Sequence, residues 1–423
     1  MLNLLTTSYR NINYAVILLA ILPAVSLIGS SFSNITVVLI NLFFLYEIFK
    51  NKNLIFFKNK FFYGLILIWI ILLINLIFFS INFENSFLRS FGFIRFILLV
   101  FALKYYLFDN HKNYSNFILN FWLTIFILIS FDVLFEFING SNILGFKSSI
   151  PGRLVSFLDQ EYKIGYIFSF LSLISFIIIF SRYKNSKYGL LKFYLLILFI
   201  LFLSFIIGER ANFIKTVVIF FLFVFFLERK FFKMKYWITG IFCILVSIFI
   251  FLAEKNISKG ILQNDHSYTH RFWITFLKPL IKNPLDSIKN TNYGDHYKTA
   301  FLIFKDYKFS GVGLKNYRII IYDENNKYNF NPSTHPHEKH LELLSELGLT
   351  GYLAFITFFL YCIIKVFRNS LVDKNTFQLG GSLFFISNLI PLIPSGSLFS
   401  TYSSIYFWIS FAFLISYSKI KVN

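Results

Sequence analysis

The sequence has little charge, few acidic residues and almost no cysteine. Charged residues make up 14% of its 423 residues against 57% hydrophobic residues, and basic residues outnumber acidic ones by 40 to 20. A soluble core of this length cannot absorb so much apolar surface, so the composition excludes a soluble globular protein and indicates a polytopic membrane protein. The two cysteines, Cys243 and Cys362, both fall in apolar runs, which argues against a disulfide framework and a cysteine-based metal site.

Several other features are missing. The first apolar run follows a single arginine, Arg10, and has no convincing small-residue cleavage site, which indicates a retained span rather than a signal peptide. No internal repeat and no glycine- or proline-rich linker marks a second independent domain. A net charge of +20 would suggest a nucleic-acid partner for a soluble protein. Here the basic residues cluster at the ends of apolar runs, so we expect membrane lipids and no nucleic acid as partners.

Apolar runs long enough to cross a bilayer recur along the chain. The predicted spans are 12–32, 34–50, 62–82, 88–107, 114–137, 164–181, 189–208, 211–228, 236–254, 347–367, 377–395 and 399–418. We therefore expect an all-α fold of about 12 transmembrane helices. Residues 1–254 hold the first nine spans, residues 255–346 form one large outer loop with short helices, and residues 347–423 hold the last three.

The placement of basic residues predicts the orientation. Lysines and arginines gather after the second, sixth, eighth, tenth and last spans, which puts all these groups on one side. The positive-inside rule makes that side the cytoplasm, so both termini are predicted to be cytoplasmic. The short connections on the other side, near Ser33 and at Ser395 to Ser400, carry no basic residue. The two long connections, 138–163 and 255–346, then both lie on the outer side.

The large outer loop holds most of the histidines in the chain: His266, His270, His296, His335, His337 and His340. Apolar residues at helical spacing predict amphipathic helices over 268–282 and 296–307. Gly311-Val312-Gly313 predicts a turn, and residues 317–322 a short extended piece. A further helix is expected to begin after Pro336 and to run toward the next span.

The histidine-rich stretch 335–340 has three interpretations. A metal site would use His337 and His340, but these are three residues apart, whereas the His-Glu-x-x-His signature places its ligands four apart, and no clear third ligand follows. The histidines could instead be solvated on a loop. The third interpretation is a general base, because a neutral imidazole can accept a proton from an attacking hydroxyl near pH 7. We favour the general base and expect no metal.

Charged residues near the outer ends of predicted spans are candidates as well. Arg210, after Glu209, and Arg153, in the first outer connection, could pair with an acid or reach toward lipid headgroups. Either arginine could instead bind a phosphate or diphosphate bidentately, which lysine does less well. Asp132 and Glu136, one helical turn apart, could form a proton site or serve as partners for the basic connections.

Three stretches together resemble the O-antigen ligase and O-antigen polymerase superfamily of bacterial inner-membrane proteins. They are Glu209-Arg210-Ala211, the run from Phe304 to Arg318 with its Gly-Val-Gly turn, and the run from Ser333 to Gly348 with its histidines. The family combines an arginine at an outer span end, a long periplasmic loop with such a turn, and a histidine motif entering the next span. Three features depart from its pattern: Glu338 replaces the usual asparagine, Lys308 replaces the usual proline, and the arginine and tryptophan often found before the glycine turn are displaced well upstream, to Arg271 and Trp273.

The resemblance implies glycan transfer from an undecaprenyl-diphosphate carrier to an acceptor hydroxyl, without nucleotide sugar, metal or other cofactor. In this comparison His337 activates the acceptor and Arg210 holds the diphosphate. Other candidate ligands of the diphosphate or the acceptor are Arg271, Arg153, Lys298, Lys315, Arg318, His335 and His340. The second diphosphate ligand could be Arg271 or another basic residue of the large loop.

The leading hypothesis is a ligase-type glycosyltransferase, which joins a lipid-carried O-antigen chain to the core sugar of lipid A at the periplasmic face of the bacterial inner membrane. A polymerase would use the same donor with a second lipid-linked glycan as acceptor, and both possibilities stay open. A transporter of the lipid-linked glycan is a more distant alternative. Transporters usually place polar residues at mid-membrane in paired halves, whereas here they gather in one asymmetric outer loop.

Overall fold

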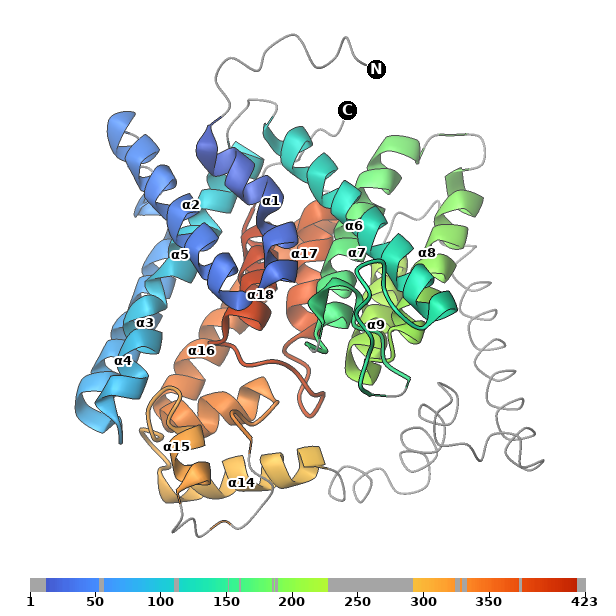
Figure 1. Ribbon diagram of the computed structural model, residues 1–423. Helices are drawn as coiled ribbons and strands as arrows, with labels where there is room; N and C mark the ends of the chain where they lie inside the picture. The colour runs from blue at the N-terminus through green and yellow to red at the C-terminus, as the bar shows by residue number, and fades with distance from the viewer. Residues whose placement is uncertain are drawn as a thin grey trace, which may run out of the picture.

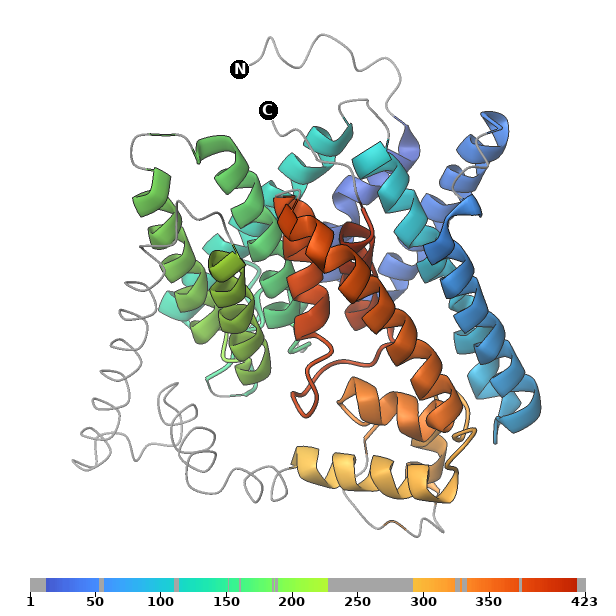
Figure 2. The ribbon, with the colours of Figure 1, turned by 180° about the vertical axis from the view of Figure 1, so that it is seen from behind.

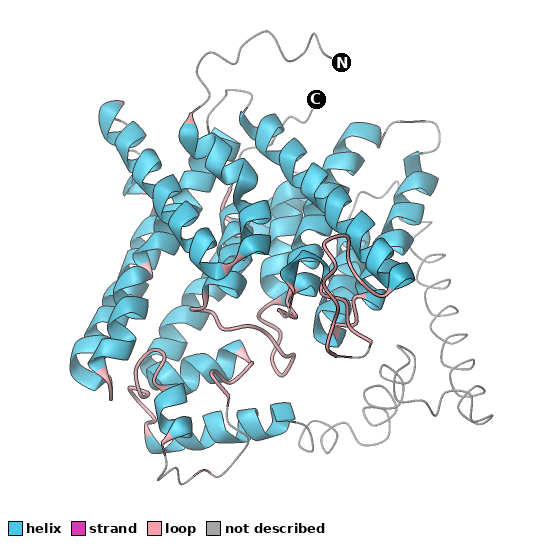
Figure 3. Ribbon diagram, in the orientation of Figure 1, coloured by secondary structure: helices cyan, strands magenta, loops and turns pink. Residues whose placement is uncertain are grey.

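The computed structural model describes residues 13–52, 57–109, 114–150, 152–159, 161–184, 186, 189–226, 292–323, 328, 333–372 and 375–416. Within these residues every regular element is a helix and none is a strand, which confirms the predicted all-α fold (Figure 3). The predicted span 236–254, the predicted helix 268–282 and Arg271 lie outside the described residues.

The helices follow most of the predicted spans. In chain order they are α1 (Tyr14–Ile28), α2 (Ser30–Lys50), α3 (Lys60–Phe79), α4 (Phe83–Gly92), α5 (Ile94–Leu103), η4 (Lys104–Asp109), α6 (Tyr114–Asn139), η5 (Ser156–Leu158), α7 (Ile164–Tyr183), α8 (Gly189–Ile206), α9 (Arg210–Phe226), α14 (Asn292–Asp306), α15 (Tyr317–Tyr322), α16 (Lys339–Val372), α17 (Thr376–Ser387) and α18 (Thr401–Leu414). Six helical segments of the described chain are long and apolar enough to cross a membrane: Ser30–Lys50, Lys60–Phe79, Phe83–Asp109, Tyr114–Asn139, Ile164–Tyr183 and Lys339–Leu371. The total of about 12 spans stays a prediction.

α18 forms the centre of the bundle. All of its residues are buried, and it packs against α2, α5, α7, α16 and α17. Its Trp408 meets the rings of Phe93 and Phe407 edge-on at centroid distances of 5.3 Å, an arrangement that favours aromatic pairs. On α3, by contrast, Leu67 and Ile74 are exposed on the outer face. A central aromatic core with apolar outer faces is what a helix bundle in lipid requires.

Two expectations about local structure are wrong. The predicted span 377–395 ends early, because α17 stops at Ser387 and residues 388–400 form an irregular connection. Pro391 and Pro394 lie in this connection, and proline cannot donate the backbone hydrogen bond that a helix needs. Residues 317–322 form the short helix α15 rather than an extended piece.

The sequence pattern misleads at α15 because its isoleucines favour strands. Tertiary packing decides otherwise: Tyr317 and Ile321 are one helical turn apart, and both are buried in a small apolar cluster with Ala300 and Ile303 of α14. This packing needs helical spacing on both sides. Helix α14 itself confirms the helix predicted over 296–307.

Several short helical segments gather at one end of the bundle. Helices α14 and α15 and the first turns of α16 lie there, at the opposite end from the start of α1 (Figures 1 and 2). Helix α18 begins beside the connection 388–400, at the end where α14 lies, and therefore runs away from it (Figure 1).

Two glycines, Gly311 and Gly348, let the turn after α14 pack against a kink in α16. Both have left-handed backbone, with φ of +66° and +63°. A Cβ atom on Gly311 would lie 2.4 Å from the backbone of Glu346, and one on Gly348 would lie 2.4 Å from the backbone of Phe309. The N–H of Gly313 donates to the carbonyl oxygen of Glu346 at 2.8 Å. This contact fixes the turn, and with it α15, on the helix that follows the histidine stretch.

We expect Gly348→Ala to lower the thermal stability of the protein in detergent. Left-handed backbone costs an alanine about 1–2 kcal/mol, and a clash with backbone atoms cannot be relieved by turning a side chain. Gly29→Ala is the matched control, because its Cβ would meet only Phe32, at 3.9 Å. The measurement is the unfolding midpoint of each variant, and equal midpoints for the two would contradict the packing argument.

Candidate functional site

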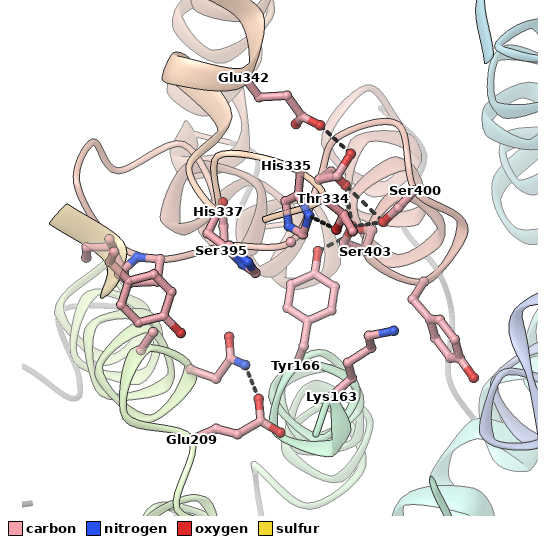
Figure 4. A pocket seen from close by; sticks show the side chains of 18 of the residues that line it. Lys163, Tyr166, Glu209, Thr334, His335, His337, Glu342, Ser395, Ser400 and Ser403 are labelled. Carbon is pink, nitrogen blue, oxygen red and sulfur yellow. Dashed lines mark hydrogen bonds between the residues drawn. The ribbon is translucent and has the colours of Figure 1, made fainter. Parts of the chain in front are cut away.

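A cavity of about 1040 Å³ lies where several helices and connections meet (Figure 4). Its wall comes from α4, α7, α9, α14, α15, α16 and α18, from the connection before α7, from the stretch 333–338 and from the connection 388–400. These segments are distant in sequence, so the cavity exists only in the folded bundle. His337 and Arg210, the two residues predicted to be catalytic, both line it.

Three histidine rings lie together at this cavity, and we call them the histidine cluster: His296, His335 and His337. The ring of His337 is 4.0 Å from that of His335 and stacks on that of His296 at 5.3 Å. Tyr293 meets His337 edge-on at 5.6 Å. Helix α14 thus presents an aromatic and a histidine against the loop histidines, which restricts the positions of their rings.

The backbone at His337 is unusual. Its φ is +59°, in the left-handed region that few residues other than glycine adopt. The preceding Pro336 is restricted in φ, and the carbonyl oxygen of His337 accepts a hydrogen bond of 2.7 Å from the N–H of Ser395. A conformation of this kind persists only where the surrounding structure holds it, and such positions occur often at functional sites.

The environment of the cluster keeps its loop histidines neutral. Burial, with a smaller contribution from the neighbouring His296, lowers the pKa of His337 to about 4. Burial also lowers the pKa of His335 well below its usual range, as do His337 and Arg318. Both rings are therefore uncharged at pH 7, the form that accepts a proton. The buried Nε2 atom of His335 has no hydrogen-bond partner among the described residues.

Arg153 and Arg210, which we call the first cation group, approach the cavity from the side of α7 and α9. Arg210 is the first residue of α9, and the charge of Arg153 acts on it directly. The carboxylate of Glu209 accepts hydrogen bonds from the N–H of Gly165 at 2.7 Å and from Nδ2 of Asn212 at 2.5 Å. Both oxygens of Glu209 are thus bonded to groups other than Arg210, and they join α7 to the start of α9.

Asp132 and Glu136 hold the connection that carries Arg153. Glu136 accepts hydrogen bonds from the N–H groups of Val155, at 3.1 Å, and Ser156, at 2.7 Å. Asp132 accepts one from Oγ of Ser156 at 2.6 Å. Asp132 and Glu136 could form a proton site or bind a connection, and these hydrogen bonds favour the second role. The acids position Arg153 indirectly, by ordering the backbone just after it.

Arg89, Lys315 and Arg318, which we call the second cation group, also line the cavity and come from α4, from the turn before α15 and from α15 itself. Arg89 of α4 donates from Nη1 to the carbonyl oxygen of Phe399 at 2.7 Å. The carboxylate of Glu346 accepts hydrogen bonds from the N–H groups of Lys315 and Tyr317, which fixes the turn before α15. Lys315 and Arg318 were candidate ligands from sequence, whereas Arg89 was not.

The connection 388–400 closes one side of the cavity. It is held by hydrogen bonds from several segments: Tyr297 Oη to Leu392 O (3.3 Å), Lys215 Nζ to Pro394 O (3.2 Å), Ser395 N to His337 O (2.7 Å) and Leu398 N to Glu342 Oε2 (2.7 Å). Glu342 also accepts a hydrogen bond from Ser397 (Figure 4). These bonds tie the connection to α9, α14 and α16, so it is an ordered part of the site.

Two sequence candidates lie away from the cavity lining. His340 is bonded at Nε2 to the carbonyl oxygen of Leu389 (2.8 Å) and at Nδ1 to the hydroxyl of Tyr352 (3.2 Å). Lys298 lies on the exposed face of α14. Neither is a lining residue. The cavity therefore brings together His337, Arg210, Arg153, Lys315, Arg318 and His335, and Arg271 lies outside the described residues.

Glu338, which departs from the family pattern, has a structural role. Its Oε2 accepts a hydrogen bond of 2.8 Å from the N–H of Leu341, and its carbonyl oxygen accepts one of 2.9 Å from the N–H of Glu342. The side chain thus caps the start of α16, a role that asparagine fills equally well. Replacement of asparagine by glutamate preserves the acceptor at this position.

Sequence reasoning missed several lining residues. Arg89 lies in the predicted span 88–107. An arginine inside a membrane span usually indicates a functional site, so the sequence alone could have identified it as a candidate. Tyr293 and Tyr297 carried no comparable signal, because aromatic residues on an amphipathic helix are common. Residues 388–400 are apolar enough that most of them were assigned to predicted spans, although two prolines argued against a continuous helix there.

No metal centre is evident in the part of the chain that the structure describes. Among those residues no three histidine, cysteine, aspartate or glutamate side chains are grouped so that they could hold a metal ion. The histidine cluster lies beside Arg318 instead, whose charge acts on His335. Cations beside neutral imidazoles favour an anionic ligand over a metal ion.

A stretch of the chain that contributes many of the site residues is also similar to a known protein family. Residues 195–356 match the family model described as O-antigen ligase. No curated protein matches the chain. The matched stretch includes Arg210, Lys315 and Arg318 and the histidine cluster. The match therefore supports the predicted resemblance: over residues 195–356 this membrane protein is similar to the O-antigen ligase family.

Proposed function

We propose that the chain is a glycosyltransferase that moves a glycan from an undecaprenyl-diphosphate carrier to a sugar hydroxyl, at the outer face of the bacterial inner membrane. The observation that carries the proposal is the meeting of His337 and Arg210 in one cavity with further cations. This combination matches the needs of the reaction, which are a base for the acceptor hydroxyl and fixed positive charge for the leaving diphosphate.

In the proposed reaction, the acceptor oxygen attacks the anomeric carbon of the donor sugar, and the bond from that carbon to the diphosphate breaks. The neutral imidazole of His337 takes the proton from the acceptor hydroxyl. The leaving diphosphate keeps the bonding electron pair, and Arg210 and Arg153 stabilise its charge. Guanidinium groups suit this role because they stay protonated and bind phosphate oxygens bidentately. The buried site strengthens these charge interactions relative to those in water.

Among acceptors, we propose the core sugar of lipid A, which makes the enzyme a ligase. A polymerase would use the same donor half of the site with a second lipid-linked glycan as acceptor. Loss of a ligase leaves lipid A core without attached chains, whereas loss of a polymerase leaves single repeat units attached. The glycan profile of a deletion strain therefore distinguishes the two reactions.

Purified protein in detergent, supplied with undecaprenyl-diphosphate-linked glycan and acceptor, should form a new glycosidic bond. Detection of the lengthened acceptor by mass spectrometry measures this directly. A transporter of the lipid-linked glycan would bind the donor without forming product. Donor binding without product, over a panel of acceptors, would therefore contradict the proposed function.

We expect transfer to continue in the presence of EDTA. Arginine and lysine side chains can supply the positive charge for the leaving diphosphate, so no divalent cation has to bridge it. The measurement compares initial rates of transfer with and without chelator. A rate that EDTA abolishes and that Mg²⁺ or Mn²⁺ restores would contradict this prediction and support the metal interpretation of the histidines.

The pH profile should report the low pKa of His337. Protonation removes the base, so kcat/KM should stay constant down to roughly pH 5 and decline as pH approaches the pKa of about 4. A histidine with an ordinary pKa would lose activity already below about pH 6.5. Bound diphosphate adds negative charge near the ring and raises its pKa, so kcat should decline at a higher pH than kcat/KM. A decline of both at the same pH would contradict this assignment.

A further inference from the structure

The cavity contains more cations than one diphosphate requires, and they form two groups on different elements. The first cation group, Arg153 and Arg210, belongs to the connection before α7 and the start of α9. The second, Arg89, Lys315 and Arg318, belongs to α4, α15 and the turn before α15. Because these elements approach from different parts of the bundle (Figure 1), the two groups can hold two anions at once.

The histidine cluster is close to both groups. On one side, Arg210 interacts electrostatically with Tyr293, whose ring is 5.6 Å from that of His337. On the other side, the charge of Arg318 acts on His335, whose ring is 4.0 Å from that of His337. The proton acceptor is therefore near both sets of cations, where an acceptor hydroxyl could meet the anomeric carbon of a donor.

The second cation group forms no ion pair with a carboxylate among the described residues. The ion pairs of the described residues are Lys104–Asp109 and Lys163–Glu161, and none involves Arg89, Lys315 or Arg318. Glu342 and Glu346 line the same wall and offset part of the charge. Hydrogen bonds to Ser397 and Leu398 and to the N–H groups of Lys315 and Tyr317 already occupy their carboxylates.

Arg89, Lys315 and Arg318 also repel one another. Burial lowers the pKa of Lys315, and the charges of Arg89 and Arg318 lower it further. The buried Nε of Arg318 has no hydrogen-bond partner within the described part of the chain. Holding like charges together costs free energy that a bound anion offsets. A phosphate group is the natural ligand, because guanidinium and ammonium groups together match its oxygens and charge.

We propose that the second cation group binds a phosphate or diphosphate carried by the acceptor, while the first binds the diphosphate of the donor. The inference rests on the proposed function, because it divides that site into donor and acceptor halves. Two acceptors have the required chemistry: a glycan attached to a second lipid diphosphate, and a lipid A core oligosaccharide with a phosphorylated sugar. In both, the phosphate anchors the acceptor and turns its terminal hydroxyl toward His337.

The test is two-substrate kinetics with purified protein. Undecaprenyl-diphosphate-linked oligosaccharide is the donor, and the acceptors share one terminal sugar: a neutral oligosaccharide, the same with one sugar phosphate, and the same linked to undecaprenyl diphosphate. Arg318→Gln should raise the KM for the preferred charged acceptor about tenfold or more and change the KM for the donor less than about twofold. Arg153→Gln should show the reverse pattern.

Two further variants complete the design. Lys315→Gln removes a second cation of the same group and should reproduce the Arg318→Gln pattern. With two such variants, the test can still be made if one of them folds poorly. Lys305→Gln removes one positive charge from the exposed face of α14, outside the cavity lining, and should change neither KM. Preference of the wild type for the sugar phosphate or the lipid diphosphate identifies which acceptor the second group serves.

The outcomes separate the two proposals. Failure of the wild type to transfer to any acceptor overturns the proposed function and this inference with it. Transfer to the neutral acceptor as efficient as to the charged ones overturns this inference alone. A rise in donor KM rather than acceptor KM in both Arg318→Gln and Lys315→Gln also overturns it, since the second cation group would then belong to the donor site.

Discussion

Replacement of His337 by alanine should reduce transfer about 10²- to 10⁴-fold, the usual contribution of a positioned general base. The neutral ring, packed between His335 and His296, is placed to receive the acceptor proton, and alanine removes the only basic atoms at this position. The measurement is kcat with saturating donor and acceptor in detergent. Membrane expression and the thermal midpoint should remain close to those of the wild type, because the ring lines a cavity rather than the core.

His337→Gln is the sharper variant. Glutamine keeps a polar side chain of similar reach and can still hydrogen-bond, but it cannot carry the proton through the reaction. It should be nearly as inactive as His337→Ala. His335→Gln serves as the comparison, because its ring lies 4.0 Å away with equal access to the cavity. An inactive His335→Gln beside an active His337→Gln would move the base to the neighbouring ring, and an active His337→Ala would remove the assignment.

Arg210→Ala should lower kcat/KM for the donor about 10²- to 10³-fold. Removal of one preorganised donor that stabilises developing charge typically costs an enzyme this much. Arg210 lines the cavity from the start of α9. The preceding Glu209 holds this part of the backbone through hydrogen bonds from Gly165 and Asn212, and these bonds do not involve the Arg210 side chain. The substitution should therefore affect the chemistry more than the fold.

Arg210→Lys provides the matched control for charge. Lysine keeps the positive charge but loses the planar fork that binds two phosphate oxygens, so it should recover part of the rate and remain well below the wild type. Inorganic pyrophosphate should inhibit the wild type competitively with donor and should inhibit Arg210→Ala more weakly. Wild-type kcat/KM in Arg210→Ala, with unchanged inhibition by pyrophosphate, would show that the diphosphate binds elsewhere.

Much of the fold was predictable because a long run of apolar residues is enough to predict a membrane span. A run such as 62–82 or 114–137 must be helical in lipid, since each backbone polar group needs a partner within its own segment. The helices α3 and α6 follow these runs closely. Prediction failed at residues 317–322 and 388–400, where the conformation favoured by local composition differs from the one that tertiary contacts stabilise. There the packing of α15 on α14, and the hydrogen bonds from α9, α14 and α16, decide the conformation.

By itself, the sequence determined the chemistry available to this protein: an apolar chain with histidines and arginines concentrated in the connections between apolar runs, and motifs similar to those of the O-antigen ligase family. Only the tertiary structure decided which of these groups meet. It brings Arg210 to His337, adds Arg89 to Lys315 and Arg318, and leaves His340 bonded to Tyr352 and Leu389. The physical reason is that residue type and spacing govern local conformation, whereas a cavity depends on the packing of segments far apart in the chain.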